Sequence, residues 1–362
     1  MNTKRLISLA AVVTIFSRCG SVSRNNFDEK ISNPIEKIIY FSSLAGNSHN
    51  TQPWYVYIEN DSVIHIKADF SRKLHIVDPD ARGLFISLGA FIENFKLAAG
   101  SFGYKTDIEI TAANKNDNNV ATIHLSKSQV SGYDLKQIEN RRTLRTAFHK
   151  KEISKEHLSK LINNNDSEVS YFSSSSKEGK FIAEQTVSAY TQQSYDDQAK
   201  QELASWMRFS NSDVEKHRDG LTTSGMGITG LGGFFVRNFF TPASSMKDSF
   251  IEKGIEKTKN QTDNCGGWVL IKQSDDCPES WIQTGRLYQS INLACKDMMI
   301  GFHPMNQMIE EENFENKVNS YLSLTGVIQF VARIGYVDEY PPANSVRRSV
   351  RNIIRYTEEN AD

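Results

Sequence analysis

The chain has 362 residues, of which 39% are hydrophobic and 23% charged, and its formal net charge is −1. This composition is that of a globular protein with one large domain or two ordinary ones, and it excludes a strong overall attraction to nucleic acid or to an anionic membrane. The four cysteines include no Cys-x-x-Cys pair and the eight histidines no His-Glu-x-x-His, so no zinc site is expected.

The N-terminus, residues 1–25, is predicted to be a targeting segment. Lys4 and Arg5 precede an apolar run, residues 6–16, that is too short to span a bilayer as a helix. Cys19 stands where the lipidated cysteine of a lipoprotein stands, whereas Arg18 occupies a position that favours a small residue. We expect export to the cell envelope or periplasm, with lipid and membrane attachment at Cys19 as one outcome. The alternative is a non-functional leader on a cytoplasmic protein.

The spacing of apolar residues then predicts alternating helices and strands up to residue 130. Helical spacing covers residues 34–43 and 83–102, the second helix ending before Gly103. Strand-like alternation covers residues 54–59, 63–68, 107–111 and 121–125. This order indicates an α+β unit.

From residue 131 a second set of elements follows. Ser154 is expected to cap a helix. Two further helices are predicted at residues 180–209 and 280–300, and strands at 268–272 and 327–336. Residues 220–245 begin with a glycine-rich apolar stretch and are interpreted either as a mobile lid or as a buried connector. Cys265 and Cys277 are interpreted as buried thiols rather than as a disulfide.

An internal repeat links the two sets of elements. Gly89 and Gly285 are 196 residues apart, and so are the Leu-Ala pairs that begin at Leu97 and Leu293. Each of these helices follows a strand-like segment. We therefore expect a duplicated α+β unit, with one half at residues 30–130 and the other at 131–362.

The first candidate binding segment is the loop at residues 48–54. Ser48, Asn50 and Gln52 carry short polar side chains ahead of Pro53 and Trp54. Such groups suit the hydrogen-bonding edge of a flat heterocycle. The alternative is an ordinary helix-to-strand loop built from turn-forming residues.

Two basic segments are further candidates. Arg141, Arg142, Thr143 and Arg145 cluster donors on one short segment, and Arg347-Arg348 follow the last predicted strand. Arginine forks suit phosphate and other electron-rich groups. The alternative for both segments is a solvated basic surface.

These motifs resemble those of nitroreductase-like flavoproteins. Residues 48–54 are similar to Ser-x-Asn-x-Gln-Pro-Trp, and residues 141–145 to Arg-[Arg/His]-[Ser/Thr]-x-[Arg/Lys]. Further segments resemble the Acg branch of that family, in which two nitroreductase-like halves are fused in one chain. They are residues 69–82, Trp206, 219–221, 333–336 and 347–348. Gly46-Asn47 and Leu88 depart from the family pattern.

The resemblance implies an α+β nitroreductase-like fold, duplicated as an intrachain pseudo-dimer, with FMN as cofactor. In reductase relatives the place of residues 303–307 supplies a backbone N–H to flavin N5, and here Gln307 replaces a glycine. The cofactor contacts implied are Ser48, Asn50, Gln52, Arg141, Arg142, Thr143, Arg145, Pro304, Met305, Asn306, Arg347 and Arg348.

Each motif occurs once, and residues 264–268 stand where a second loop motif is expected. We therefore expect a monomer that binds one FMN per chain. We expect an FMN-binding oxidoreductase that passes hydride or electrons from a small-molecule donor to a small acceptor of the quinone or nitro class, without a dedicated side-chain acid or base. The alternative is an FMN-sequestering or storage protein with little or no turnover.

Overall fold

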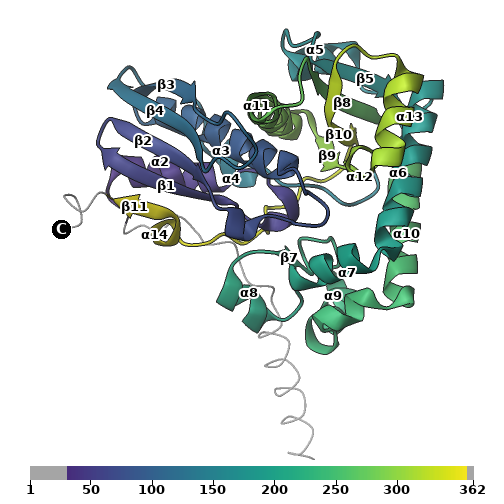
Figure 1. Cartoon of the computed structure of the whole chain (residues 1–362). Coiled ribbons are helices and arrows are strands. Elements are labelled where there is room, and N and C mark those ends of the chain that lie inside the picture. Colours follow the sequence, from purple (N-terminus) through teal and green to yellow (C-terminus); the bar gives the residue numbers. More distant parts are fainter. Residues whose placement is uncertain (1–30, 357–362) are drawn as a thin grey trace, which may run out of the picture.

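Two β-sheets stand on either side of a pair of long helices in the computed structural model, which describes residues 31–356 (Figure 1). The central helices are α3 (Arg82–Ser101) and α11 (Pro278–Cys295). The α+β fold class is thereby confirmed. The predicted leader and Cys19 lie outside the described residues.

The first sheet has the strand order β11-β1-β2-β4-β3. Strands β1 to β4 pair antiparallel, whereas β11, from the C-terminal end of the chain, pairs parallel with β1. The end of the chain therefore completes the sheet that its beginning forms. The strands are β1 (Trp54–Asn60), β2 (Val63–Ala68), β3 (Tyr104–Ile110), β4 (Asn119–Lys127) and β11 (Ile354–Tyr356).

The second sheet has the strand order β5-β8-β10-β9, and all its pairs are antiparallel. Its central strands β8 and β10 are almost continuously apolar, because α11 covers one face and α6 the other. The strands are β5 (Val169–Ser173), β8 (Gly267–Gln273), β9 (Ile300–Pro304) and β10 (Val327–Tyr336).

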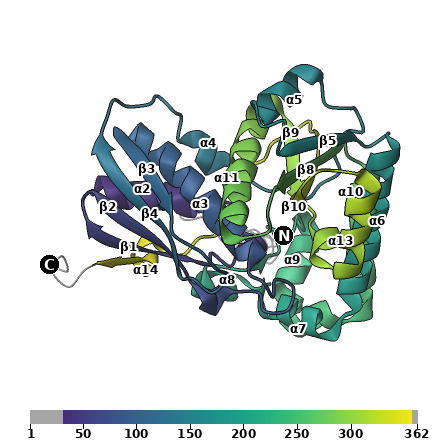
Figure 2. The ribbon, with the colours of Figure 1, turned by 45° about the horizontal axis from the view of Figure 1, so that its top comes forward.

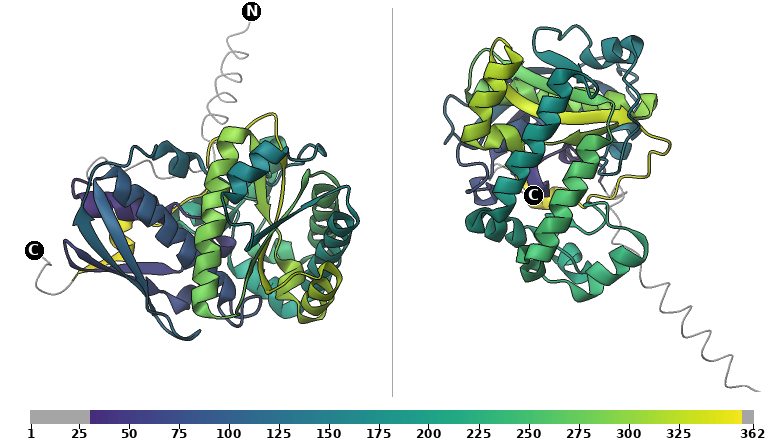
Figure 3. Two further views of the ribbon diagram at one scale, coloured as in Figure 1. Left: turned by 90° about the horizontal axis from the view of Figure 1, so that it is seen from above. Right: turned by 90° about the vertical axis from the view of Figure 1, so that its right-hand side faces the viewer.

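Helices fill the space around these sheets. Helix α2 (Pro34–Ser43) packs on α3, and its N-cap Asn33 accepts a hydrogen bond from the Ile35 N–H at 2.8 Å. Seen from above, α11 stands between the sheets, and the side view shows α6 (Lys177–Tyr195) beside α10 (Asp248–Asp263) on the outer face (Figure 3). The others are α4 (Lys136–Asn140), α5 (Lys155–Ile162), α7 (Asp197–Ser205), α8 (Asn211–His217), α9 (Gly230–Phe239), α12 (Gln307–Glu310), α13 (Glu312–Leu322) and α14 (Val350–Ile353).

The two central helices touch backbone to backbone (Figure 2). A Cβ atom added to Gly89 would lie 2.0 Å from the Ile282 carbonyl oxygen, and one added to Gly285 would lie 2.0 Å from that of Ile86. Only glycine permits this approach. Beside it, buried Gln289 donates to the Asn94 side chain at 2.8 Å.

Several sequence predictions need correction. The helix predicted at 180–209 breaks at Asp196, whose side chain accepts from the Ala199 N–H and starts α7 instead. The helix predicted at 280–300 ends at Cys295, and Ile300 already belongs to β9. The Ser154 cap is confirmed, because its hydroxyl accepts from the His157 N–H at 3.2 Å.

The chain between α6 and α10 forms a lobe of short helices below the second sheet (Figure 1). It contains the predicted lid segment, within which α9 and the short strand β7 (Leu221–Thr222) lie. Strand β7 pairs parallel with β6 (Met207–Arg208). Within residues 31–356, no helix combines the length and apolar character needed to cross a membrane.

The three cysteines of the described range are free thiols. Cys265 is buried, as expected, whereas Cys277, which was also expected to be buried, is half-buried; Cys295 is buried too. No three His, Cys, Asp or Glu side chains of residues 31–356 come together as a metal site requires.

Candidate functional site

The loop that precedes β1 is held in a strained conformation. His49, Asn50 and Gln52 have φ angles of 45°, 54° and 53°, in the left-handed region that non-glycine residues rarely adopt. The Asn47 side chain accepts from the Gln52 N–H at 2.9 Å, and the Ser48 N–H donates to Ser87 on α3 at 3.2 Å. Such strain persists only where surrounding contacts hold it, and it concentrates at functional sites.

The C-terminal arginine pair contacts this loop directly. Arg347 Nη1 donates to Asn50 Oδ1 at 2.9 Å, and the Arg348 backbone N–H donates to Gln52 Oε1 at 2.9 Å. Arg348 Nη2 also donates to the Gln52 and Trp54 carbonyls, at 2.7 and 2.8 Å. Segments almost 300 residues apart in the sequence are therefore hydrogen-bonded to each other.

Arg347 is engaged by the protein itself. Its guanidinium donates to the carbonyls of Ser43, Leu44 and Ala45, which end helix α2, and to the Val346 carbonyl in addition to Asn50. The side chain is 3% exposed. A cation at the negative end of a helix is stabilised there, so Arg347 supports the loop and α2 in this structure.

Arg141 lies beside Arg347 but has far fewer hydrogen-bond partners. Its Nη2 donates to the same Leu44 carbonyl at a long 3.4 Å. Its Nε and Nη1 are buried without a hydrogen-bond partner, and the residue is only 4% exposed. Buried donors of a charged group are costly to leave unpaired. This guanidinium is therefore suited to an added electron-rich ligand.

The rest of the arginine motif spreads outward. Arg142 Nη1 donates to the Pro342 carbonyl at 2.7 Å, and its buried Nε has no partner. Thr143 is half-buried, and Arg145 Nη1 donates to the Gly225 carbonyl at 2.8 Å. Burial lowers the pKa of Arg145 to about 10. The Leu144 N–H donates to the Phe302 carbonyl and so fixes the segment to β9.

The segment after β9 is anchored to β10. The Met305 N–H donates to the Val331 carbonyl at 2.9 Å, and Asn306 Oδ1 accepts from the Val331 N–H at 2.8 Å. Pro304 has no N–H to donate. Of these three residues, Asn306 has the backbone N–H that remains for another group. The structure joins this segment to the arginine motif through Leu144, and among the described residues no hydrogen bond links it to the 48–52 loop.

Part of the predicted lid covers the loop. Asn50 Nδ2 donates to the Gly220 carbonyl at 3.3 Å, and the Gly220 N–H donates back to the Asn50 carbonyl at 3.1 Å. Gln52 Nε2 donates to the Arg218 carbonyl at 2.8 Å. Residues 218–227, which we call the cover segment, therefore touch Asn50, Gln52 and Arg145.

A cluster of charged side chains joins the cover segment to the chain that follows strand β2 of the first sheet. Buried Asp219 pairs with Arg72, which follows β2, and with Arg208 at 3.0 Å. Both guanidinium groups lie over the Trp206 ring, at 5.5 and 5.7 Å from its centroid. Three segments singled out by the family resemblance thus meet at one point.

Two residues at the site were not predicted from the sequence. His49 Nδ1 is buried without a partner, and burial lowers the His49 pKa to about 4. Lys257, on α10, donates from Nζ to the Met226 carbonyl of the cover segment at 2.7 Å. His49 lies within the loop motif, so the sequence could have indicated it. Nothing in the sequence indicated Lys257, because its neighbours at the site come from distant segments.

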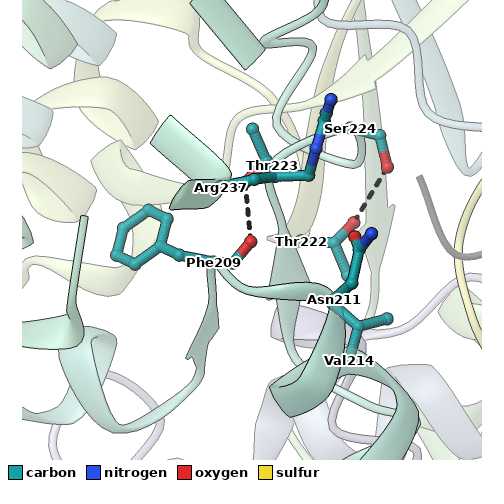
Figure 4. A pocket seen from close by; sticks show the side chains of 7 residues that line it. All are labelled: Phe209, Asn211, Val214, Thr222, Thr223, Ser224 and Arg237. Atoms are coloured by element: carbon teal, nitrogen blue, oxygen red, sulfur yellow. Dashed lines mark hydrogen bonds between the residues drawn. The ribbon is translucent and has the colours of Figure 1, made fainter. Parts of the chain in front are cut away.

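A small pocket lies at the edge of the lobe, with a volume of about 10 Å³, room for about one water molecule (Figure 4). It is smaller than the roughly 300–1,000 Å³ of typical cofactor sites, and it contains none of the predicted cofactor residues. Its hydroxyls bond within the lobe, Thr222 to Ser224 and Thr223 to the Phe209 carbonyl. It is lined by Phe209, Asn211, Val214, Thr222, Thr223, Ser224 and Arg237. The candidate site is therefore the arginine-lined loop.

Comparison with known families decides the broader identity. The model of the nitroreductase family matches residues 138–336, more than half of the chain. The chain belongs to the nitroreductase family. The matched range includes the arginine motif and residues 304–306, whereas the 48–52 loop and the terminal arginine pair lie outside it. This nitroreductase-family protein matches no curated protein.

Solved structures of related proteins are similar to it at low identity. The FMN-dependent nitroreductase NfnB from Mycobacterium smegmatis, in complex with NADPH, is 14% identical with a TM-score of 0.41, covering 62% of this chain and 97% of that one. A putative nitroreductase from Anabaena variabilis is 11% identical with a TM-score of 0.48, covering 84% and 87%. The FMN and NADPH-dependent NfnB from a Sphigopyxis strain is 11% identical with a TM-score of 0.38, covering 61% and 97%.

Proposed function

We propose that this nitroreductase-family protein binds FMN and passes electrons from a small reduced donor to a small acceptor of the quinone or nitro class. The observation that carries the proposal is Arg141, a buried guanidinium with two unpaired donor atoms, which shares the Leu44 carbonyl with Arg347, the partner of Asn50. The donors fit the electron-rich edge or the phosphate of FMN. When bound, FMN supplies the hydride chemistry, and the chain positions it.

The contacts divide the predicted cofactor residues by role. Arg348 retains a buried Nε without a partner, so it suits the phosphate better than Arg347, all of whose N–H groups already face protein acceptors. Arg347 then positions Asn50 and α2. Ser48, Gln52, Arg142, Thr143, Arg145 and residues 304–306 remain proposed contacts.

We also infer that the chain is a pseudo-dimer of two duplicated halves. Two matching strand orders support it: β1-β2-β4-β3 in the first sheet and β5-β8-β10-β9 in the second, each with its long helix between the second and third strands of the chain order. The helix starts, Arg82 and Pro278, are 196 residues apart, as are the β3 and β9 starts. The reciprocal approach of Gly89 and Gly285 is what a twofold axis produces.

This alignment moves the expected place of the second loop motif. Because β5 corresponds to β1, the loop equivalent to 48–53 is the one before β5, not residues 264–268, which precede β8. Asn163 and Asn164 there have φ angles of 46° and 66°, similar to His49 and Asn50. Asn163 is the C-cap of α5, where a left-handed residue is common, and no Gln-Pro-Trp sequence follows it, which supports one FMN per chain.

A second candidate function is flavin sequestration. The observation that favours it is the cover segment, which bonds to Asn50, Gln52 and Arg145 at once. A segment held this firmly excludes substrate unless it opens. The two functions differ in turnover rather than in flavin binding.

One set of measurements tests these proposals. Purified protein saturated with FMN should be yellow and release one flavin per chain. Stopped-flow mixing with NADPH, then with a quinone or a nitroarene, should bleach and restore the flavin absorbance. Flavin that is bound but not reduced by NADPH or by NADH favours sequestration, and protein that binds no flavin contradicts both functions.

We further propose export, based on the leader sequence alone. Cell fractionation with N-terminal sequencing should find a mature chain that begins about residue 18 to 25 in the envelope fraction. Full-length protein confined to the cytosol contradicts it.

A further inference from the structure

Three cationic side chains meet beneath the cover segment. Arg145 and Lys257 donate to consecutive carbonyls, those of Gly225 and Met226, at 2.8 and 2.7 Å. A Cβ atom added to Gly227 would lie 3.6 Å from Arg145 Cβ and 3.7 Å from Lys257 Nζ, so both side chains reach the same side of this turn. Arg333 lies close enough to lower the pKa of Lys257 further, after burial.

These cations have no acidic partner. None of the ion pairs found within the described part of the chain involves Arg145, Lys257 or Arg333. Arg333 is fully buried and donates to the carbonyls of Gln261, Asn264 and Thr146 and to His303 Nδ1. Buried charge of one sign without a counter-ion is unfavourable, and it attracts an anion.

His303 does not add to this charge. Burial, followed by the nearby Arg333, Arg145 and Lys257, holds its pKa well below the usual value, so the imidazole is neutral. It accepts from Arg333 Nε at 3.0 Å on Nδ1, which places its proton on Nε2. The excess positive charge therefore rests on the two arginines and the lysine.

The turn over these cations is rich in glycine. Gly225, Gly227 and Gly230 lie within six residues, and Gly227 and Gly230 have φ angles of 75° and 62°. Besides the carbonyl bonds to Arg145 and Lys257, Asn344 donates to the Ser224 carbonyl at 2.8 Å and Thr223 donates to the Phe209 carbonyl at 3.4 Å, and the other hydrogen bonds of the turn lie within residues 222–228. When the turn opens, Arg145 and Lys257 lose these two neutral carbonyl acceptors, and an anion can take their place.

We propose that Lys257, together with the Nη1 of Arg145 that the Gly225 carbonyl now occupies, binds an anionic oxygen group, a carboxylate or a phosphate, of the small molecule that exchanges electrons with the flavin; the other donors of Arg145 remain for its proposed flavin contact. The inference rests on the proposed function and narrows its substrate class to anionic compounds. In the closed state the Gly225 and Met226 carbonyls occupy the two donors. An entering anion displaces them and supplies the charge that the cluster lacks, so anionic substrates both bind and open the cover segment.

The test compares Lys257→Met with Lys259→Met, using full-length protein loaded with flavin. Lys259 is exposed on the same helix and makes no side-chain contact to the cover segment. Methionine keeps the length of the side chain and removes one of three mutually repelling charges, so the variant should fold at least as stably as wild type. Thermal unfolding checks this.

Three pairs of probes identify the source of the anion. The acceptor pair is 4-nitrobenzoate and 4-nitrobenzamide, the donor pair is reduced nicotinamide mononucleotide and reduced nicotinamide riboside, and the cofactor pair is FMN and riboflavin. Binding of the first two pairs is read from perturbation of the flavin absorbance, which needs no turnover, and the third from fluorescence titration. We expect Lys257→Met to weaken binding of the anionic member of the acceptor pair or of the donor pair by about tenfold or more. Binding of the neutral member should not change.

The outcomes separate the two proposals. Unchanged binding of every probe to Lys257→Met, or equal loss for both members of a pair, overturns the anion site while FMN binding by the wild type upholds the proposed function. If Lys257→Met loses binding of FMN but not of riboflavin, the lysine binds the cofactor phosphate, and the proposed substrate-anion site is overturned. Wild-type protein that binds no flavin contradicts the proposed function itself.

Discussion

Gly89 and Gly285 face each other where α3 crosses α11, and each lies against the carbonyl of the residue three positions before the other. Gly89 meets Ile282, and Gly285 meets Ile86, so the contact is the same when read from either helix. The crossing joins the two sheets, and therefore the stability of the whole molecule depends on it.

The first prediction concerns this crossing. Gly89→Ala or Gly285→Ala places a methyl group 2.0 Å from a backbone oxygen that cannot rotate away, and we expect a loss of about 3 kcal/mol in the free energy of unfolding. Urea denaturation measures it. Gly232→Ala on α9 is the control: nothing lies within 4 Å of its Cβ position, so it should be neutral or slightly stabilising. Equal effects of all three variants would refute the close approach.

The second prediction separates Arg141 from Arg347. Arg141→Gln removes a buried charge that has one long hydrogen bond, so flavin-free protein should gain about 1 kcal/mol or more in stability while FMN affinity falls by about 2–5 kcal/mol. Arg347→Gln leaves the carbonyls at the end of α2 without donors and should cost about 3 kcal/mol of stability.

Urea denaturation of the flavin-free variants and fluorescence titration with FMN provide both numbers. Arg351→Gln, at an exposed position of the same basic stretch, should change neither. A surface role for the whole basic cluster predicts that all three variants behave as wild type does.

The third prediction is a dependence of stability on pH. Burial lowers the pKa of His49 to about 4 from an ordinary 6.5, so the unfolded chain binds a proton more readily than the folded one between these values. Stability should be complete above pH 6.5 and fall as the pH drops toward 4. His303, with its pKa lowered in the same direction, contributes a loss of the same sign.

His49→Asn isolates the part due to His49, and asparagine tolerates the φ of 45° at this position. Urea denaturation at several pH values should give a shallower decline for this variant than for wild type. Identical slopes would mean that His49 is protonated equally in both states.

The fourth prediction concerns the cover segment. Asp219→Asn removes the partner of Arg72 and Arg208, leaves two largely buried cations uncompensated, and so weakens the tie between the lobe and the first sheet. Limited trypsin digestion should cleave within residues 208–247 faster than in wild type, and FMN should associate faster. Glu252→Gln, at an exposed position on α10, is the matched control. Unchanged cleavage would show that the hydrogen bonds to Asn50 and Gln52 hold the segment by themselves.

Local sequence features determined much of the secondary structure. The helix at residues 34–43 and the strand at 327–336 were predicted with the bounds that the structure has, because capping residues and apolar periodicity act over neighbouring positions. Elements ended early where a single side chain intervened, as Asp196 does in the helix predicted at 180–209. The strands β9 and β11 gave no recognisable local pattern, because they are short and their pairing partners are distant in the sequence.

The residue types of the candidate site were likewise contained in the sequence: the 48–52 loop and the two arginine segments stood out through their resemblance to family motifs, whereas their composition alone suits an ordinary loop and a solvated basic surface equally well. The different roles of these residues could not be predicted from the sequence. Arg347 and Arg141 differ in the acceptors that surround them, and most of these acceptors are carbonyls at the end of helix α2, roughly 300 residues from Arg347 and 100 from Arg141. Lys257 became part of the site solely because α10 passes under the cover segment. Composition and periodicity are properties of neighbouring residues, whereas a guanidinium or an ammonium group is satisfied or left unpaired by whatever the tertiary fold brings within hydrogen-bonding distance.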